Sequence, residues 1–297
     1  MGSAIFIQIS KNEFLEPTLS INVGRISNIL ISFPTLPEQK RIASFFTVLD
    51  KKIAELKQKK NLLEQYKKGV MQRLFLSELG LVGLEDDRID DDDKNENPTI
   101  VKSNKSKFRQ LRFKDDTSTP LSAGNGKEFP KWEKKKLGEI CEKKSSNISA
   151  NKIEENFGEF IIYGASGVLK KVDFYEEEND YVSIIKDGAG VGRIVYCKGK
   201  SSVLGTMEII KPKIELNTYF LYCLLENIDF TKYITGSTIP HIYFKDYKNE
   251  ICEIPCLEEQ TKIANFLSAL DEKINQTENQ IQQTQQWKKG LLQKMFV

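Results

Sequence analysis

The sequence predicts an α+β protein in which a strand-rich mixed domain lies between two long helices. Three observations support this prediction. A segment of 48 residues at 28–75 recurs at 249–296 without a gap, and 18 of its positions are identical. Each copy carries an apolar repeat of seven residues, which is typical of a coiled-coil helix. The chain between the copies contains short β-branched or aromatic runs separated by turn signals, which is typical of strands.

The composition excludes several classes of protein. The length of 297 residues suggests about two domains. With 44 Lys and Arg against 42 Asp and Glu, the formal net charge is only +2, which argues against a uniformly basic protein that coats DNA. The sequence has no apolar run long enough for a transmembrane helix and no signal-peptide pattern, so we expect a cytoplasmic protein without a membrane partner.

The cysteines and the single histidine argue against a metal centre. The five cysteines match no disulfide framework, and we expect reduced thiols. Cys252 and Cys256 are four residues apart, but a zinc site needs about four ligands, and His241 is the only histidine. We therefore predict no metal, no cofactor and no catalytic residues.

The first long helix is predicted at 36–76 and the second at 257–297. Both keep an apolar seam for about five heptads, but polar residues interrupt the seams at different places. The second helix has Ile281 where the first has Lys60. Each helix would therefore cover the weak stretch of the other, and polar seam residues help to select a partner and a register. The alternative is two separate amphipathic helices that pack on a globular core.

Residues 77–127 are predicted to form a flexible charged linker. An acidic block at 85–94 precedes a basic block at 102–114, and polar residues fill the remainder. Such a segment buries too little apolar surface to offset the entropy of folding. The basic block offers an alternative function, contact with DNA phosphates.

The mixed domain is predicted at 128–256. One helix is expected at 217–227. Expected strands are bounded by turn signals and lie at 159–163, 180–186, 192–197 and 207–210.

A glycine-rich turn lies between the second and third of these strands. Gly188, Gly190 and Gly192 form GxGxG rather than GxGxxG, and a strand rather than a helix follows. A phosphate-binding loop would need a helix N-terminus there. We therefore predict a hairpin turn.

Several short motifs point to a known family. The helices begin with PTLPEQ at 34–39 and PCLEEQ at 255–260, followed by FTVLDKKI at 46–53 and LSALDEKI at 267–274. The mixed domain contains YGASGV at 163–168, DGAGVGR at 187–193 and GSTIPH at 236–241. In this combination and order, the motifs resemble the specificity (S) subunits of type I restriction-modification systems.

The resemblance implies a DNA-recognition role. It implies that the mixed domain is a target recognition domain that reads one half of a split site in double-stranded DNA. It also implies that the long helices pair as an antiparallel coiled coil, set the half-site distance and dock methyltransferase (M) subunits, which motor-nuclease (R) subunits join. An S subunit is not itself the catalyst.

The first recognition domain of that family has little counterpart in this chain. Residues 1–35 resemble only the remnant of such a domain, so the chain resembles a truncated or half-length S subunit. A homodimer that reads an interrupted palindrome is one hypothesis that follows, because the symmetry of a DNA site mirrors that of the protein.

Candidate DNA-binding residues were taken from the loops, because a scaffold positions loops for function. For each candidate, the alternative is an exposed loop side chain that makes no DNA contact. For Tyr163 and Tyr243, the alternative is a role in packing. The candidates are Tyr163, Ser166, Lys170, Lys171, Lys186, Arg193, Ser201, Thr206, Ser237, Thr238, His241, Tyr243 and Lys245.

Two other functions remain open from the sequence. The chain could be a structural adaptor, or a silent or decoy half-subunit, that engages partner subunits without binding DNA. An enzyme acting on nucleic acid is the weaker alternative, because no catalytic constellation appears. Sequence-dependent and salt-dependent DNA affinity distinguishes the recognition subunit from the adaptor.

Overall fold

A computed structural model describes residues 34–75, 111–115, 127–153 and 158–295. Residues 1–33 of the predicted remnant at 1–35 and most of the predicted linker at 77–127 lie outside these residues. The chain divides into two compact units, Met1–Gln65 with Asp271–Val297 and Tyr66–Leu270. The elements, in order, are α2 (Leu36–Leu74), β1 (Lys114–Asp115), β2 (Lys127–Glu128), β3 (Glu133–Lys136), α3 (Leu137–Ile140), β4 (Cys141–Ser145), η2 (Ala150–Lys152), β5 (Phe160–Gly164), β6 (Gly167–Val172), β7 (Tyr181–Ile185), β8 (Ile194–Cys197), β9 (Ser201–Val203), β10 (Met207–Pro212), α4 (Thr218–Glu226), η3 (Thr231–Tyr233), α5 (Phe244–Tyr247), β11 (Ile251–Ile254) and α6 (Leu257–Met295).

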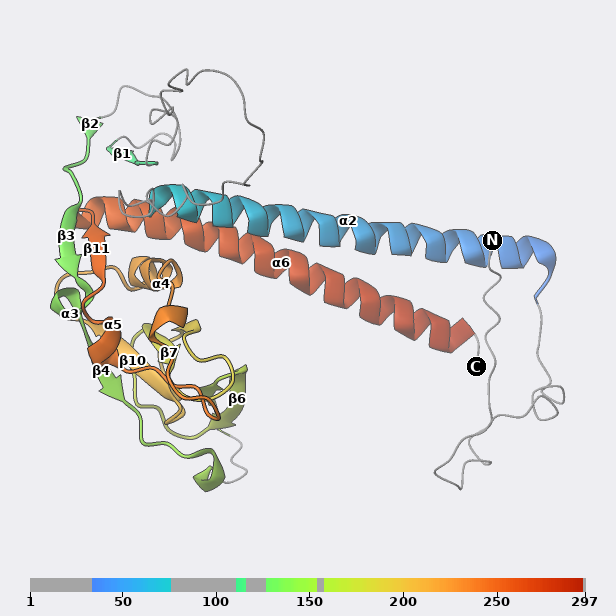
Figure 1. Ribbon diagram of the computed structural model, residues 1–297. Coiled ribbons are helices and arrows are strands. Elements are labelled where there is room, and N and C mark those ends of the chain that lie inside the picture. Colours follow the sequence, from blue (N-terminus) through green and yellow to red (C-terminus); the bar gives the residue numbers. More distant parts are fainter. Residues whose placement is uncertain (1–33, 76–110, 116–126, 154–157, 296–297) are drawn as a thin grey trace, which may run out of the picture. The chain divides into compact units, whose positions relative to one another are not determined.

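The first unit is an antiparallel helix pair, formed by parts of α2 and α6 that lie side by side (Figure 1). Lys288 forms an ion pair with Asp50, and Lys60 forms one with Glu278 at 2.8 Å. Since the residue numbers rise along α2 while those of their partners fall along α6, the helices run in opposite directions. Lys60 interrupts the apolar seam, and its ion pair satisfies the charge there. The predicted antiparallel pairing is confirmed.

The seam of the helix pair is buried as the heptads predict. Leu49, Ile53 and Leu56 of α2 are 6–8% exposed, and Thr277 and Ile281 of α6 are 2% and 4% exposed. The outer faces carry charged side chains. Within the described ranges, no helix is both long enough and apolar enough to cross a bilayer.

The two long helices begin in the same way, because the repeated sequence provides the same side chains. The Nε2 atom of Gln39 donates to the carbonyl of Pro34 at 2.8 Å, and that of Gln260 donates to the carbonyl of Pro255 at 2.9 Å. Proline lacks an N–H and fixes φ, so it fits directly before a helix. The glutamine side chain then ties the first turn of each helix to the incoming chain.

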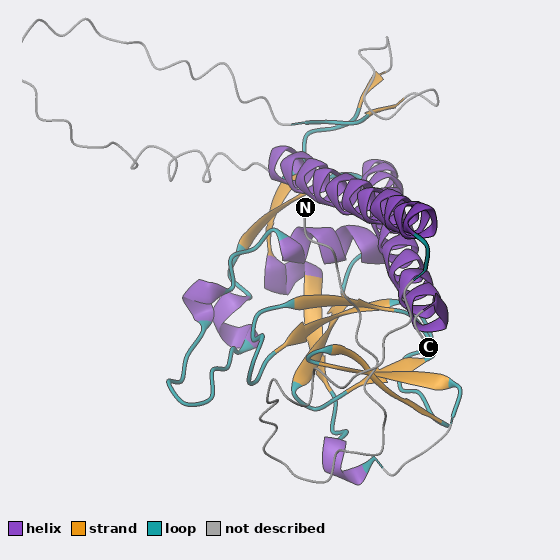
Figure 2. Ribbon diagram, turned by 90° about the vertical axis from the view of Figure 1, so that its right-hand side faces the viewer, coloured by secondary structure: helices purple, strands orange, loops and turns teal. Residues whose placement is uncertain are grey.

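The second unit contains the mixed domain. One sheet has the strand order β4-β10-β7-β8, and all of its neighbouring strands are antiparallel. A second sheet has the order β6-β5-β9, in which β5 and β9 are parallel. Figure 2 shows these strands together with the short helices of the unit. Helix α4, capped by Asn217, packs on β7 and β8. The predicted α+β class is confirmed.

The core of the second unit includes the ends of both long helices. Val70 and Leu74, in the last turns of α2, share one apolar cluster with Ile263 and Leu267, in the first turns of α6. Phe220 of α4 belongs to the same cluster and is fully buried. These turns are therefore an integral part of the mixed domain's core.

Part of the predicted linker also belongs to this core. Phe113 is 2% exposed, and its ring centroid is 5.8 Å from that of Phe266. The backbone N–H of Leu111 donates to the carbonyl of Arg73 at 2.9 Å. The prediction of a flexible linker over 77–127 is therefore wrong for residues 111–113. Two apolar side chains, Leu111 and Phe113, pack into the core here. The basic residues around them had indicated a solvated linker.

We expect a buried carboxylate to make the second unit sensitive to acid. Glu177 is 7% exposed and pairs with Lys144 at 2.5 Å and Lys211 at 2.8 Å. Burial alone would raise the pKa of Glu177, but hydrogen bonds from both lysines reverse this and hold the pKa below its ordinary value of 4.5. The stabilisation is therefore complete above about pH 4.5 and is lost as the pH falls through the lowered value.

Denaturant unfolding at several pH values tests this expectation. The stability gap between the wild type and Glu177→Gln should be largest at neutral pH and should close below pH 4.5. The control is Glu178→Gln, whose side chain is 58% exposed and 3.9 Å from Lys200. A gap for Glu177→Gln that does not change with pH would contradict the expectation.

Candidate nucleic-acid interface

The glycine-rich turn connects β7 to β8, and the antiparallel pairing of these strands confirms the predicted hairpin. Gly188, Gly190 and Gly192 have φ values of 83°, 87° and 84°. Residues other than glycine rarely adopt such backbone angles. The three glycines thus shape a compact loop at residues 186–193.

Backbone hydrogen bonds join this loop to two distant segments. The N–H of Gly188 donates to the carbonyl of Pro240 at 2.9 Å, and the N–H of Ile242 donates to the carbonyl of Lys186 at 3.0 Å. The N–H of Lys186 donates to the carbonyl of Thr206 at 3.0 Å. Residues 186–193, Thr206 and residues 235–245 therefore form one continuous surface, which we call the loop surface.

The loop surface brings together most of the predicted DNA-binding residues. Lys186 and His241 are half-buried, and the others are exposed. The predicted residues on this surface are Lys186, Arg193, Thr206, Ser237, Thr238, His241, Tyr243 and Lys245.

The Arg193 side chain lies against Gly190 of the glycine loop. A Cβ atom on Gly190 would lie 2.3 Å from the Nη2 atom of Arg193, so the guanidinium occupies the space that glycine leaves open. The backbone N–H of Arg193 donates to the carbonyl of Gly190 at 3.1 Å. The chain thus presents an exposed guanidinium beside the glycine loop, and such a group can recognise a guanine through two hydrogen bonds.

An edge-to-face aromatic pair also lies on the loop surface. The His241 and Tyr243 rings are 5.0 Å apart between centroids, and the ammonium group of Lys245 lies 5.2 Å from the Tyr243 ring. Tyr243 is 49% exposed. An exposed ring beside a cation suits a nucleotide, because the ring contacts the base or sugar and the cation contacts a phosphate.

Sequence reasoning missed Ile239, an apolar side chain that is 64% exposed on the same segment. An apolar side chain on a DNA-facing loop can contact a thymine methyl group. Its place within the GSTIPH motif at 236–241 could have indicated this role, although apolar residues are more often found in a protein core.

The charges of the loop surface nearly balance. Lys186, Arg193 and Lys245 are accompanied by Asp187, and Asp246 follows directly after the surface. A surface with so little net charge gains little from phosphate attraction alone. Directed contacts to base edges would therefore have to provide much of the affinity.

Two predicted DNA-binding residues are buried instead. Ser201 is 1% exposed, and its hydroxyl lies 3.0 Å from that of Tyr181. Tyr163 is 8% exposed, and its hydroxyl accepts a hydrogen bond from the N–H of Lys198 at 3.3 Å. Neither side chain is available to DNA, so both predictions are corrected. The packing alternative stated for Tyr163 describes its position.

Three further candidates lie on the β5–β6 hairpin, outside the loop surface. Lys170 and Lys171 are exposed on β6, the edge strand of the three-stranded sheet, and Ser166 is exposed in the preceding turn. Their assignment to DNA contact stays a prediction.

The cysteines do not form a reactive or metal-binding centre in the described chain. All five are free. Burial is the main cause that raises the pKa of the Cys141, Cys197 and Cys252 thiols to about 12, which leaves them protonated at neutral pH. Among the residues described, no group of three or more metal-ligating side chains comes together.

A pair of glycine substitutions tests whether the position of Arg193 matters. Gly188→Ala and Gly190→Ala impose the same strain at positive φ, about 1 kcal/mol each. Only the Cβ at position 190 would displace the guanidinium, because nothing lies within 4 Å of a Cβ at position 188. We expect similar losses of thermal stability but a loss of DNA affinity for Gly190→Ala alone, measured by fluorescence anisotropy. Equal affinities of the two variants would contradict this role.

The geometry defines a class of protein that contains a loop-bearing mixed domain and a long antiparallel helix pair. A family model described as the type I restriction modification DNA specificity domain matches residues 4–65 and 130–285. The chain therefore belongs to this family.

Individual relatives agree with this assignment. A Mycoplasma pneumoniae protein named as a type I specificity subunit is 29% identical over 148 residues, which cover 47% of this chain and 48% of that protein. The Escherichia coli type I restriction enzyme EcoDI specificity subunit is 28% identical over 157 residues, which cover 52% of this chain and 34% of that protein. The chain thus matches about half or less of these relatives' lengths.

One solved structure has a similar fold. The crystal structure of the S subunit of a type I restriction-modification system from M. genitalium matches with a TM-score of 0.58 and 19% identity, covering 89% of this chain and 62% of that one. At this identity, the likeness concerns the fold alone.

Proposed function

We propose that this chain is a DNA-recognition subunit of a type I restriction-modification complex and that its mixed domain reads one half-site in double-stranded DNA. The observation that carries the proposal is the loop surface, where backbone hydrogen bonds join three segments far apart in sequence. Arg193, Lys245 and the exposed Tyr243 lie on it together. Family membership supports the same function.

The side chains of the loop surface suit recognition in a groove. The exposed guanidinium of Arg193 can donate two hydrogen bonds to guanine O6 and N7. Ser237 and Thr238 are exposed on the same segment as the aromatic pair, and their hydroxyl groups can bond to base edges or phosphates. Rigid backbone bonds between the segments would keep these groups in a fixed relative position.

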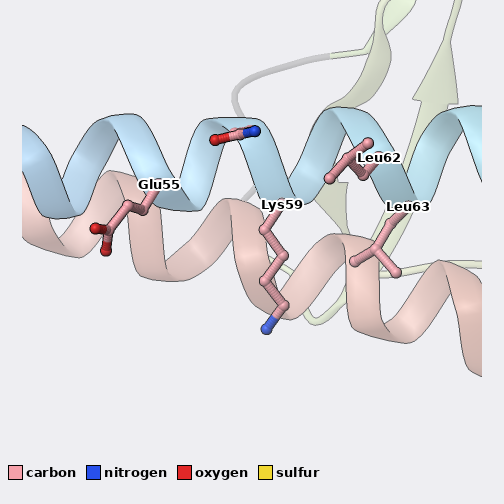
Figure 3. A pocket seen from close by; sticks show the side chains of 5 residues that line it. Glu55, Lys59, Leu62 and Leu63 are labelled. Carbon is pink, nitrogen blue, oxygen red and sulfur yellow. The ribbon is translucent and has the colours of Figure 1, made fainter.

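We propose that the helix pair docks methyltransferase (M) subunits and that R subunits join through them. In support, α2 carries a shallow groove lined by Glu55, Gln58, Lys59, Leu62 and Leu63 (Figure 3). Leu62 is 56% exposed. An apolar side chain framed by charged ones is typical of a protein-binding surface. In this proposal, the partner subunits carry catalysis, and the chain acts in the cytoplasm without a catalytic role of its own.

A homodimer is part of the proposal. The described residues contain a single mixed domain, and a closed two-fold dimer would present two copies of it to DNA. The target would then be an interrupted palindrome. Light scattering of the chain with its M subunit tests this point, since a complex with one copy of the chain would exclude it.

Selection from a library of random duplexes tests the proposed function. The chain, in complex with its M subunit, is incubated with the library at two salt concentrations, and the bound duplexes are sequenced. We expect a short motif to be enriched at both concentrations, because base contacts discriminate between sequences. Retention without any enriched motif, or no retention, would contradict the proposal. An intact complex that fails to select DNA would support the adaptor instead.

A further inference from the structure

The most deeply buried carboxylate at the start of α6 belongs to Glu259. It is 0% exposed. The Arg112 guanidinium donates a bidentate pair of hydrogen bonds to this carboxylate, from Nε to Oε1 at 2.8 Å and from Nη2 to Oε2 at 2.7 Å. A carboxylate taken out of water needs such partners, and the two-pronged arginine pair fixes direction as well as distance.

Trp132 completes this arrangement, which we call the Glu259 cluster (Arg112, Trp132 and Glu259). The indole Nε1 donates to Oε2 of Glu259 at 3.0 Å, and the guanidinium carbon of Arg112 lies 5.6 Å from the Trp132 ring. The Nη2 atom of Arg112 also donates to the carbonyl of Pro130 at 2.7 Å. The cluster thus ties the segment that leads into β3 to the first turn of α6.

The next residue of α6 holds a second distant segment. Oε1 of Gln260 accepts a hydrogen bond from the N–H of Asn217 at 3.0 Å. The side chain of Asn217 caps α4 by accepting from the N–H groups of Tyr219 and Phe220 at 3.0 and 3.1 Å. Helix α4 packs on β7 and β8, the strands that carry the glycine loop of the loop surface.

We infer that Arg112 is a positioning residue that, by gripping Glu259, fixes where the loop surface lies relative to the first turns of α6. The inference rests on the proposed function, since the position matters because those loops meet DNA. Arg112 acts through the fold and contacts no base. Replacing it should alter where the loops are presented while leaving their own side chains intact.

The repeat provides a matched control within the chain. Glu38 occupies the position in α2 that Glu259 occupies in α6, and Gln39 makes the same bond to a proline carbonyl as Gln260 does. Glu38 is exposed, whereas Glu259 is buried. Glu38→Gln and Glu259→Gln therefore make the same chemical change at equivalent helix positions.

The test is a distance measurement in the full chain by pulsed electron paramagnetic resonance. Spin labels on unnatural amino acids replace Asn265 of α6 and Thr206 of the loop surface, both of which are exposed. We expect one narrow distance distribution for the otherwise wild-type chain and for Glu38→Gln. Arg112→Lys keeps the positive charge but loses the bidentate hydrogen bonds to Glu259. We expect this variant and Glu259→Gln to broaden or shift the distance distribution.

Trp132→Phe keeps the inference testable if the charge variants fail to fold, because it removes the indole donor but keeps an aromatic ring and leaves Arg112 and Glu259 unchanged. A broadened distribution in this variant supports the inference. If Arg112→Lys and Trp132→Phe lower the thermal midpoint but keep the wild-type distribution, the cluster is merely stabilising and the inference is wrong. Selection of DNA by the wild type is scored separately, so failure of the proposed function is distinguishable from failure of this inference.

Discussion

Arg193→Glu should weaken binding of a selected duplex by about 5- to 150-fold, which corresponds to about 1–3 kcal/mol for a lost bidentate base contact. Arg193 is exposed and lies against Gly190, so the substitution removes a donor pair without opening the core. Fluorescence anisotropy with selected and scrambled duplexes measures the effect. The loss should be greater for the selected duplex than for the scrambled one.

Arg41→Glu is the matched control for this substitution. Arg41 is exposed on α2, in the helix-pair unit, and the change in charge is the same. Arg41 belongs to none of the three segments that form the loop surface, so we expect its substitution to leave the affinity nearly unchanged. An equal loss of affinity in both variants would mean that net charge, rather than the loop surface, governs binding.

Leu56→Ala should destabilise the helix pair by about 2–5 kcal/mol, as large-to-small substitutions in a core do. Leu56 is 6% exposed in the seam, where the removed methyl groups would leave a cavity. Thermal unfolding followed by circular dichroism at the helical band measures the change. We expect the helical transition to move to a lower temperature and assembly with the M subunit to weaken.

Leu62→Ala makes the same substitution on the same helix at a position that is 56% exposed. Exposed substitutions of this kind usually change stability by no more than about 0.5 kcal/mol. Its melting curve in the isolated chain should therefore match that of the wild type. If Leu56→Ala also melts like the wild type, the seam does not hold the helices together.

Sequence reasoning succeeded where structure depends on local periodicity. The seven-residue spacing that includes Leu49 and Leu56 specifies one helix face, and the structure buries that face. The glycine spacing at 188–192 predicted a hairpin for a similar reason, since positive φ angles are a local requirement. The predicted helix at 217–227 corresponds to α4, whose cap is the adjacent Asn217.

Features that depend on contacts between distant residues could not be predicted. Nothing near Ser201 in the sequence indicates that its hydroxyl lies against that of Tyr181 in the core. The anchoring of Phe113 depends on Phe266, more than a hundred residues away. The loop surface likewise depends on hydrogen bonds between distant segments. The sequence motifs identified these segments one by one but did not indicate that they lie together.

Site-specific photo-cross-linking tests the central claim, that the loop surface reads DNA, most directly. A photoreactive amino acid replaces Tyr243 on the loop surface in one sample and Lys170 on the β5–β6 hairpin in another, and each chain is irradiated with the selected duplex. We expect strong cross-links from position 243 to bases within the enriched motif, whatever position 170 yields. Cross-links confined to position 170, or from neither position to the motif, would contradict the account.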